Sequence, residues 1–328
     1  MKSLIRAAAG SFAARSGALS AFERAARGAL AVLCYHRVLP EAERARYHTP
    51  DLVVTPETLR AHCRILAERY TVAPLGTALA AWQRGEVSDR PLVAITFDDG
   101  YRDNMRYATP ILRAHGLRAT FYVIAGLVDT DEQPWYDIVG AAFGSAAQED
   151  SATGPADAAA ALEKAKRLAP AERAAWVAAL RSEPASRVRD DDLIMTSGQI
   201  RSLADEGHEI GSHSMTHPLL TQCADDALAT EMGASRERLS AIAGRAVTGL
   251  CYPNGDHDRL VRRAAAAAGY AYAAALDPGL NDRRTADVFA LRRWFIAQGR
   301  LADSRGAPSD ALLRMELSGL SRRLFGRA

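Results

Sequence analysis

The stretch LVAITFDDG, residues 92–100, decides how the rest of the chain is interpreted. Its first six residues form an apolar run rich in β-formers, which predicts a strand buried on both faces, as in parallel sheets. Asp98 and Asp99 end that run, and Gly100 permits a tight turn. Adjacent carboxylates at a buried strand end are costly unless a cation neutralises one or one is a tuned base. Taken alone, the pair also fits a solvated Asp-Gly turn or a helix N-cap.

Apolar runs and helical patterns alternate on both sides of this strand, which is typical of parallel α/β folds. The predicted strands are Leu30–Tyr35, Leu92–Phe97, Ala119–Ala125, Glu209–Gly211, Thr248–Tyr252 and Tyr270–Ala275. The predicted helices are Pro56–Tyr70, Ala108–His115, Gln199–Glu206, Ala224–Ala243 and Leu260–Gly269. We expect an α/β fold with a closed or nearly closed (β/α) barrel, although a doubly wound open sheet would give a similar pattern. Both architectures place active residues at the carboxyl ends of the strands.

Three segments depart from this alternation and suggest the domain organisation. Residues 1–29 are rich in Ala, Leu and Arg with helical spacing and predict a basic amphipathic extension. Residues 30–298 form the expected α/β domain, which is interrupted at about 129–192 by an inserted, partly Ala-rich helical segment over 156–180. Residues 299–328 predict a basic amphipathic helical tail. The two terminal segments could contact an anionic membrane surface or simply pack as ordinary surface helices.

Composition narrows the class of protein. The 328 residues include 41 basic and 39 acidic ones, and a net charge of +2 gives no field that favours a nucleic-acid partner. The four cysteines are far apart without a C-x-x-C pair, so neither a zinc ribbon nor a disulfide framework is indicated. We see no signal peptide and no run of ~20 apolar residues, and therefore expect a cytoplasmic protein, with possible peripheral contact with the inner membrane. Nothing indicates an obligatory protein partner.

The segment HSMTH, residues 213–217, places two histidines four residues apart, where a helical turn would align them. Neutral imidazoles suit zinc, cobalt, nickel and iron, and one carboxylate would complete a His-His-Asp face with positions left open for water and substrate. A histidine pair seen alone is more often structural.

Two further strand ends carry polar groups. The segment YPNG, residues 252–255, predicts a turn that could direct the Asn254 amide into a site. His36 ends the opening strand and could act as a general acid near neutral pH, although alone it would more often be structural.

Together, TFDDG (96–100) and HSMTHP (213–218) resemble the polysaccharide deacetylases of carbohydrate esterase family 4, whose NodB homology domain is a distorted (β/α) barrel. The resemblance covers roughly residues 30–296, with YPNG following in the expected order. It implies that Asp98 is the general base, and that Asp99, His213 and His217 hold a divalent ion, zinc in the first place and cobalt or nickel otherwise. It also implies an oxyanion or substrate role for the turn at Tyr252, Pro253 and Asn254.

Departures from the family pattern locate two further candidates. The arginine usual before the proline turn is missing from residues 249–252, and no histidine follows His257 to act as the usual late acid. The opening YHRV, residues 35–38, is similar to that of the poly-N-acetylglucosamine deacetylase branch, which makes His36 the candidate acid. The segment LRRW, residues 291–294, resembles the family's final strand, where Arg293 or Trp294 would orient the base or line the sugar pocket.

The implied function is metal-dependent removal of N-acetyl groups from the amino sugars of a polysaccharide or lipid-linked glycan, in exopolysaccharide or cell-envelope biosynthesis. One alternative is an amidase or esterase of the same fold that acts on a different substrate, because fold and metal alone fix no substrate. Another is a catalytically silent carbohydrate-binding member.

Overall fold

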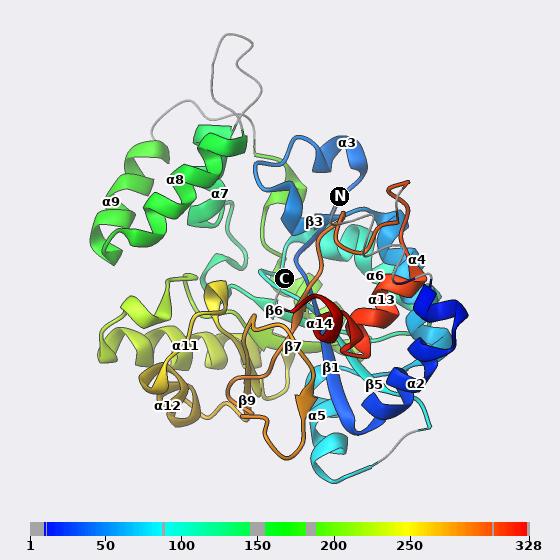
Figure 1. Ribbon diagram of the computed structural model, residues 1–328. Helices are drawn as coiled ribbons and strands as arrows, with labels where there is room; N and C mark the ends of the chain where they lie inside the picture. The colour runs from blue at the N-terminus through cyan, green and yellow to red at the C-terminus, as the bar shows by residue number, and fades with distance from the viewer. Residues whose placement is uncertain are drawn as a thin grey trace.

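The computed structural model describes residues 10, 12–86, 89–144, 155–181, 188–303 and 305–326. A curled, mostly parallel sheet lies at its centre, with helices around it (Figure 1). Neighbouring strands follow the order of the chain: β1 (Ala29–Tyr35), β5 (Leu92–Phe97), β6 (Thr120–Val123), β7 (Glu209–Ser212), β8 (Gly249–Cys251) and β9 (Tyr272–Ala274). Each predicted strand is therefore confirmed, with its ends shifted by a few residues.

The sheet returns on itself through the segment that follows β9. Leu291 forms a parallel bridge with Ala274 of β9, and β11 (Trp294–Phe295) then pairs in parallel with β1. β10 (Asn281–Asp282) pairs antiparallel with the start of β1. This closure confirms the distorted barrel and excludes the open doubly wound sheet.

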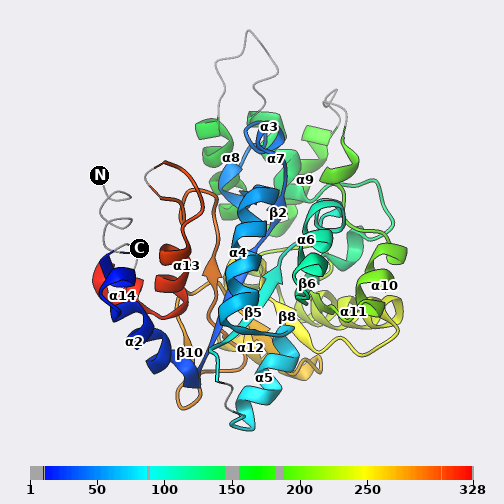
Figure 2. The same cartoon turned by 90° about the vertical axis from the view of Figure 1, so that its right-hand side faces the viewer.

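Helices connect the strands and cover the outside of the sheet (Figures 1 and 2). The predicted helices are found as α4 (Pro56–Arg69), α6 (Thr109–Ala114), α10 (Ser197–Asp205), α11 (Asp225–Ala243) and α12 (Arg259–Ala267). α10 begins with a reciprocal capping box, in which Thr196 accepts from the Gln199 amide and the Gln199 side chain accepts from the Thr196 amide. Among the shorter elements, β4 (Thr71–Val72) pairs with β5. β2 (Arg37–Val38) and β3 (Val53–Val54), with α3 (Glu41–Arg44) between them in the chain, form a separate two-stranded sheet.

A helix that the sequence did not predict, α5 (Leu75–Gln83), fills the end of the barrel away from the strand C-termini. Its Leu75 and Trp82 pack with Leu30, Ala94 and other small or apolar residues of the strands' inner face. Because successive side chains of a strand point to opposite faces, the alternate residues of β5 pack outward instead. The inner row of β5 therefore runs from Ala94 through Thr96 toward Asp98.

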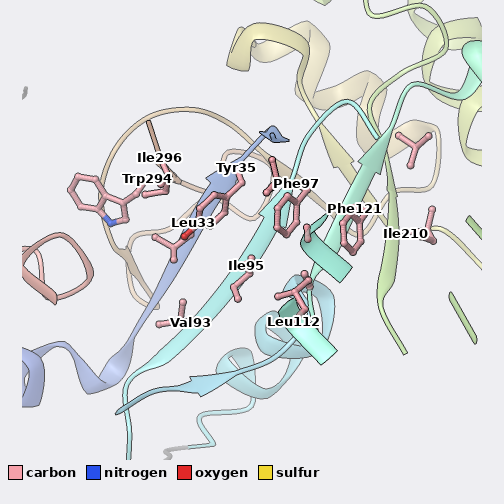
Figure 3. Packing of buried hydrophobic residues seen from close by; sticks show 14 of the residues in the cluster. Leu33, Tyr35, Val93, Ile95, Phe97, Leu112, Phe121, Ile210, Trp294 and Ile296 are labelled. Atoms are coloured by element: carbon pink, nitrogen blue, oxygen red, sulfur yellow. The ribbon is translucent and has the colours of Figure 1, made fainter. Parts of the chain in front are cut away.

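The outer face of the sheet carries the larger core (Figure 3). Tyr35, Phe97 and Phe121 are paired in register on three adjacent strands, and their rings stack with centroids 5.4 and 5.0 Å apart. Leu112 of α6 packs on the same cluster. Stacked aromatic neighbours of this kind add about 0.5–1.5 kcal/mol per pair beyond their buried area, and they hold the strands that carry the polar residues at the edge.

In the part of the inserted segment that the structure describes, there are three α-helices, α7 (Trp135–Gly144), α8 (Pro155–Arg167) and α9 (Pro170–Arg181). The helical stretch predicted over 156–180 is found, divided into the two helices α8 and α9. Pro170 starts a new helix, since proline fits the first turn but not a helix interior. Val139, Ala161, Ala165 and Val177 form a small core of their own between these helices.

The terminal helices pack against each other. α2 (Ala18–Ala25) lies beside α13 (Asp310–Leu317) and α14 (Leu320–Phe325), as Figure 2 shows. Arg314 pairs with Glu23 at 2.7 Å, and apolar residues of both ends, such as Leu19 and Leu317, are buried. The predicted extension before residue 10 lies outside the described residues.

This packing favours the surface-helix interpretation of the two ends, although Phe12 and Leu324 remain 68% and 54% exposed. Contact with an anionic membrane stays a prediction. Among the described residues, no helix combines the length and apolar character needed to cross a membrane.

Two buried structural histidines are expected to make the stability of the fold depend on pH. His62 lies against the Tyr35 hydroxyl, His208 accepts a hydrogen bond from the Ala119 amide, and burial lowers the pKa of each to about 4. Between pH 6.5 and 4 the unfolded chain therefore binds more protons than the native protein. The free energy of unfolding is therefore highest above pH 6.5. It falls as the pH drops from 6.5 to 4, by on the order of 1–3 kcal/mol for each histidine.

Urea unfolding across this pH window measures the loss. The variant His208→Gln, whose amide oxygen can still accept from Ala119, should show a shallower pH dependence, whereas His115→Gln in the half-buried end of α6 should behave as wild type. Equal pH dependence of all three proteins would contradict the assignment.

Candidate active site

Polar residues gather at the carboxyl edge of the barrel, where β1, β5, β7 and β8 end. His36 follows β1, Asp98 and Asp99 follow β5, and His213 follows β7. All four are buried, with exposed fractions between 1% and 9%. Residues from three strands therefore converge on one site, as the sequence led us to expect.

Asp98 is bound by an arginine from the segment that closes the barrel. Arg293, which is fully buried, donates to both carboxylate oxygens at 2.7 and 2.8 Å. The thiols of Cys34 and Cys251 lie 3.3 and 3.4 Å from Oδ2. Burial acts to raise the pKa of Asp98, but the paired guanidinium overrides it and holds that pKa well below its usual range. Asp98 is thus ionised in the barrel interior.

Arg293 occupies the barrel interior because the closing segment brings it there. Its Nε donates to the Ala275 carbonyl at 2.8 Å and its Nη1 to the Thr96 hydroxyl at 3.1 Å, so every part of the guanidinium is held. Its neighbour Trp294 points the other way, into the outer core, and is 3% exposed (Figure 3). Of the two residues expected to orient the base or line a pocket, only Arg293 touches Asp98.

Asp99 faces two imidazoles rather than an arginine. Its Oδ1 lies 3.4 Å from His213 Nε2 and 3.6 Å from His217 Nε2. Burial, with the adjacent charge of Asp98, raises the pKa of Asp99 well above its usual value. The three side chains offer ligand atoms within 4.8 Å of one another, and such a buried His-His-Asp set fits a divalent ion.

The backbone that carries the histidines is not helical, which corrects the expectation of a helical turn. Ser214 and His217 both have positive φ, at 65° and 58°, and the loop is fastened by Glu231. The Glu231 carboxylate accepts from the Met215 amide at 2.8 Å and from the Thr216 amide at 2.9 Å. This strained loop, rather than an i, i+4 helical pair, turns both imidazoles toward Asp99.

The second nitrogens of the two rings differ in their partners. His213 Nδ1 lies 2.8 Å from the Cys251 carbonyl, to which it donates, so its Nε2 is left as the acceptor. His217 Nδ1 is buried and has no hydrogen-bond partner among the described residues. The orientation of His217 therefore depends on other contacts.

His36 lies beside Asp98 and is not one of the three residues of the His-His-Asp set. Its Nε2 is 3.9 Å from Asp98 Oδ2, and its ring meets Phe295 edge to face. Burial lowers the pKa of His36 to about 4, although the charge of Asp98 opposes that effect. The imidazole is consequently neutral near pH 7 in the free protein.

The turn at residues 252–255 lies at the same edge but presents few side chains to the site. Pro253 begins a single helical turn in which Asn254 has φ 59° and an exposed side chain that donates to Asp256. Tyr252 is buried, and its hydroxyl donates to the Phe289 carbonyl at 2.8 Å. Any contribution of Asn254 to catalysis would come from its backbone.

Breaking the buried ion pair of Arg293 and Asp98 should lower the stability of the protein strongly. Arg293→Met removes the charge but keeps most of the volume, and leaves Asp98 as an uncompensated buried carboxylate. Removing one partner of such a pair costs about 3–5 kcal/mol, which urea unfolding would measure. The neighbouring Arg292→Met, at a half-buried position, is the matched control and should cost far less. Equal stability of the two variants would contradict this account.

Comparison with known proteins agrees with the motifs. Residues 85–273 match the family model described as polysaccharide deacetylase. The chain is 22% identical over 264 residues to the Bacillus subtilis protein YxkH, whose name places it among the polysaccharide deacetylases, and the match spans 80% of this chain and 72% of that protein.

Solved structures share the fold at low identity. The Streptococcus pyogenes deacetylase PplD is similar with a TM-score of 0.61 at 19% identity, over 88% of this chain and 98% of that chain. The deacetylase domain of BpsB from Bordetella bronchiseptica is similar with a TM-score of 0.54 at 18% identity, over 82% and 96% of the two chains. The family match covers more than half of the sequence, and the chain belongs to the polysaccharide deacetylase family.

Proposed function

We propose that this deacetylase is a metal-dependent hydrolase that removes N-acetyl groups from the amino sugars of a polysaccharide or lipid-linked glycan. The observation that carries the proposal is the buried Asp99-His213-His217 set beside Asp98, whose own charge is already balanced by Arg293. Asp98 is thus paired with the guanidinium of Arg293, whereas Asp99 faces the two imidazoles.

Asp99, His213 and His217 would hold the ion, with zinc as the first choice and cobalt or nickel as alternatives. When bound, such an ion lowers the pKa of water at the site and polarises the acetamide carbonyl. The elevated pKa of Asp99 in the protein alone supports this assignment, since a cation would stabilise its ionised form. The hydrogen bond from His213 Nδ1 to Cys251 supports it too, because it commits Nε2 to the ligand role.

Asp98 would act as general base and accept the proton of the water that attacks the acetamide carbon. Arg293 fixes both carboxylate oxygens in place, so the base is oriented at the cost of some basicity. As the carbonyl becomes tetrahedral, negative charge develops on its oxygen, and the backbone amide at Asn254 is our candidate donor to it. Tyr252 and Pro253 would shape that turn.

His36 would protonate the nitrogen of the departing amino sugar as the carbon–nitrogen bond breaks, which leaves acetate and a free amine. Because its pKa is about 4 in the free protein, the imidazole must gain its proton within the complex. Asp98, whose Oδ2 lies 3.9 Å from His36 Nε2, would pass on the proton that it accepts from the water. Negative charge that develops beside the ring during the attack would raise the pKa of His36 and so favour the protonated imidazole.

The resemblance of the opening strand to poly-N-acetylglucosamine deacetylases supports a role in exopolysaccharide biosynthesis. It is consistent with similarity in fold to BpsB and to IcaB from Ammonifex degensii, the latter with a TM-score of 0.53 at 16% identity. Acetate release from N-acetylated oligosaccharides would separate this function from an amidase with another substrate and from a silent carbohydrate-binding protein.

Replacing Asp98 by Asn should abolish acetate release from N-acetylglucosamine oligomers, because the amide cannot accept the proton of the attacking water. Zinc content should stay at the wild-type level, since Asp98 is not among the proposed ligands. Elemental analysis and an acetate assay on the same sample test both statements, with exposed Asp282→Asn as the control. A wild-type rate in Asp98→Asn with normal zinc would disprove the base assignment.

Replacing His36 by Ala should lower the turnover rate by about 10²–10⁴-fold, the usual contribution of a positioned acid or base. Zinc affinity should be unchanged, because His36 is not one of the proposed ligands Asp99, His213 and His217. The control His115→Ala should keep the wild-type rate. Loss of zinc in His36→Ala would instead make His36 a ligand, and an unchanged rate would remove it from the mechanism.

A further inference from the structure

Helix α7 of the insertion begins with Trp135, Tyr136 and Asp137 directly beside the proposed metal ligands. We infer that this first turn is a positioning element for the metal site, with Tyr136 as its central residue. The inference rests on the proposed function, because it concerns Asp99 and His217 as ligands. The insertion would then complete the site rather than merely cover the barrel.

Tyr136 touches one ligand with its hydroxyl and another with its ring. The hydroxyl lies beside the Asp99 carboxylate, whose ionised form it favours, and 3.3 Å from the Tyr101 hydroxyl. The ring meets the His217 imidazole at a centroid distance of 4.8 Å and an angle of 61°, which is an edge-to-face contact. A single side chain therefore restrains the carboxylate and one imidazole at the same time.

The need for this restraint is greater at His217 than at His213. A metal-binding histidine ordinarily donates its second ring N–H to a partner that fixes the orientation of the ring. His213 has such a partner in the Cys251 carbonyl, whereas the buried His217 Nδ1 has none among the residues described. Packing against Tyr136 takes the place of the missing hydrogen bond.

The backbone of the second histidine is fastened to the same turn. Trp135 Nε1 donates to the His217 carbonyl oxygen at 2.8 Å. His217 itself has φ 58°, a conformation that a bulky residue adopts at a cost and keeps only where its surroundings hold it. The indole bond thus helps to maintain a backbone conformation that directs the imidazole toward Asp99.

Asp137 anchors the turn to the barrel. Its buried carboxylate accepts hydrogen bonds from Tyr47 at 2.6 Å, from Tyr101 at 2.7 Å and from His48 at 2.9 Å. Tyr47 and His48 lie between α3 and β3, and Tyr101 follows the strand that carries Asp99. A buried charge with this many donors is both satisfied and held in one position. The contacts of Tyr136 with the ligands are therefore made from a rigid support.

Two substitutions at Tyr136 separate its two contacts. Tyr136→Phe removes the hydroxyl from Asp99 and keeps the ring beside His217, whereas Tyr136→Leu removes both. Loss of a residue that orients a metal ligand typically lowers metal affinity by about 10–100-fold. We expect a loss at the lower end of that range for Tyr136→Phe and a larger one for Tyr136→Leu, measured by competition of the full-length apoprotein with a zinc chelator.

Phe143→Leu is the matched control, because Phe143 lies on the same helix but packs on Trp176 within the insertion. It should bind zinc as wild type does. Cobalt-loaded protein gives a second readout that a merely structural tyrosine would not move: the visible cobalt bands should shift in both Tyr136 variants and stay unchanged in Phe143→Leu.

The outcomes distinguish this inference from the function on which it rests. If the wild-type protein takes up no stoichiometric zinc or cobalt, the proposed metal site fails and the inference fails with it. If wild type binds metal and both Tyr136 variants match its affinity and its cobalt spectrum, the site stands and the positioning role is disproved. Reduced affinity in Tyr136→Leu alone would assign the effect to the ring contact with His217 and exclude the hydroxyl.

Discussion

The ion pair between Asp98 and Arg293 is the interaction on which the site and the closure of the barrel both depend. Asp98 stands at the end of the strand that decides the fold, and Arg293 belongs to the segment that returns to β1. A buried pair of this kind is a weak source of net stability, yet breaking it is costly because one charge is then left without a partner. The pair thus ties the proposed general base to the last strand, so that the barrel must close for the site to form.

The same pair explains how two adjacent carboxylates are tolerated in one buried edge. Asp98 is ionised because a fixed guanidinium balances it, whereas burial and the adjacent charge of Asp98 raise the pKa of Asp99. The surroundings therefore shift the pKa values of the two acids in opposite directions. This separation is what a site needs when one carboxylate receives protons and the other receives a cation.

Sequence reasoning succeeded where the chemistry lies in short motifs. The strands, Asp98, Asp99 and the histidine pair are each visible within a few residues, and the structure brings them together at one edge. It was less successful where one residue's role depends on distant partners. Arg293 was only one of two candidates, because the sequence does not show which of Arg293 and Trp294 faces the barrel interior. Helix α5 was missed because its mixed small and apolar residues carry no clear helical face.

The sequence could not indicate a role for Tyr136, because that role also depends on distant partners. A tyrosine at the start of an inserted helix has the pattern of an ordinary half-apolar residue. Its importance comes from its contacts with Asp99 and His217, which lie 37 and 81 positions away in the chain. The hydrogen bonds that fix Asp137 also come from separate parts of the chain, before and after β5. Motifs that carry chemistry can be local because each strand end delivers its own residue to the edge. The contacts that hold those residues at a working geometry are made across elements, and only the folded chain displays them.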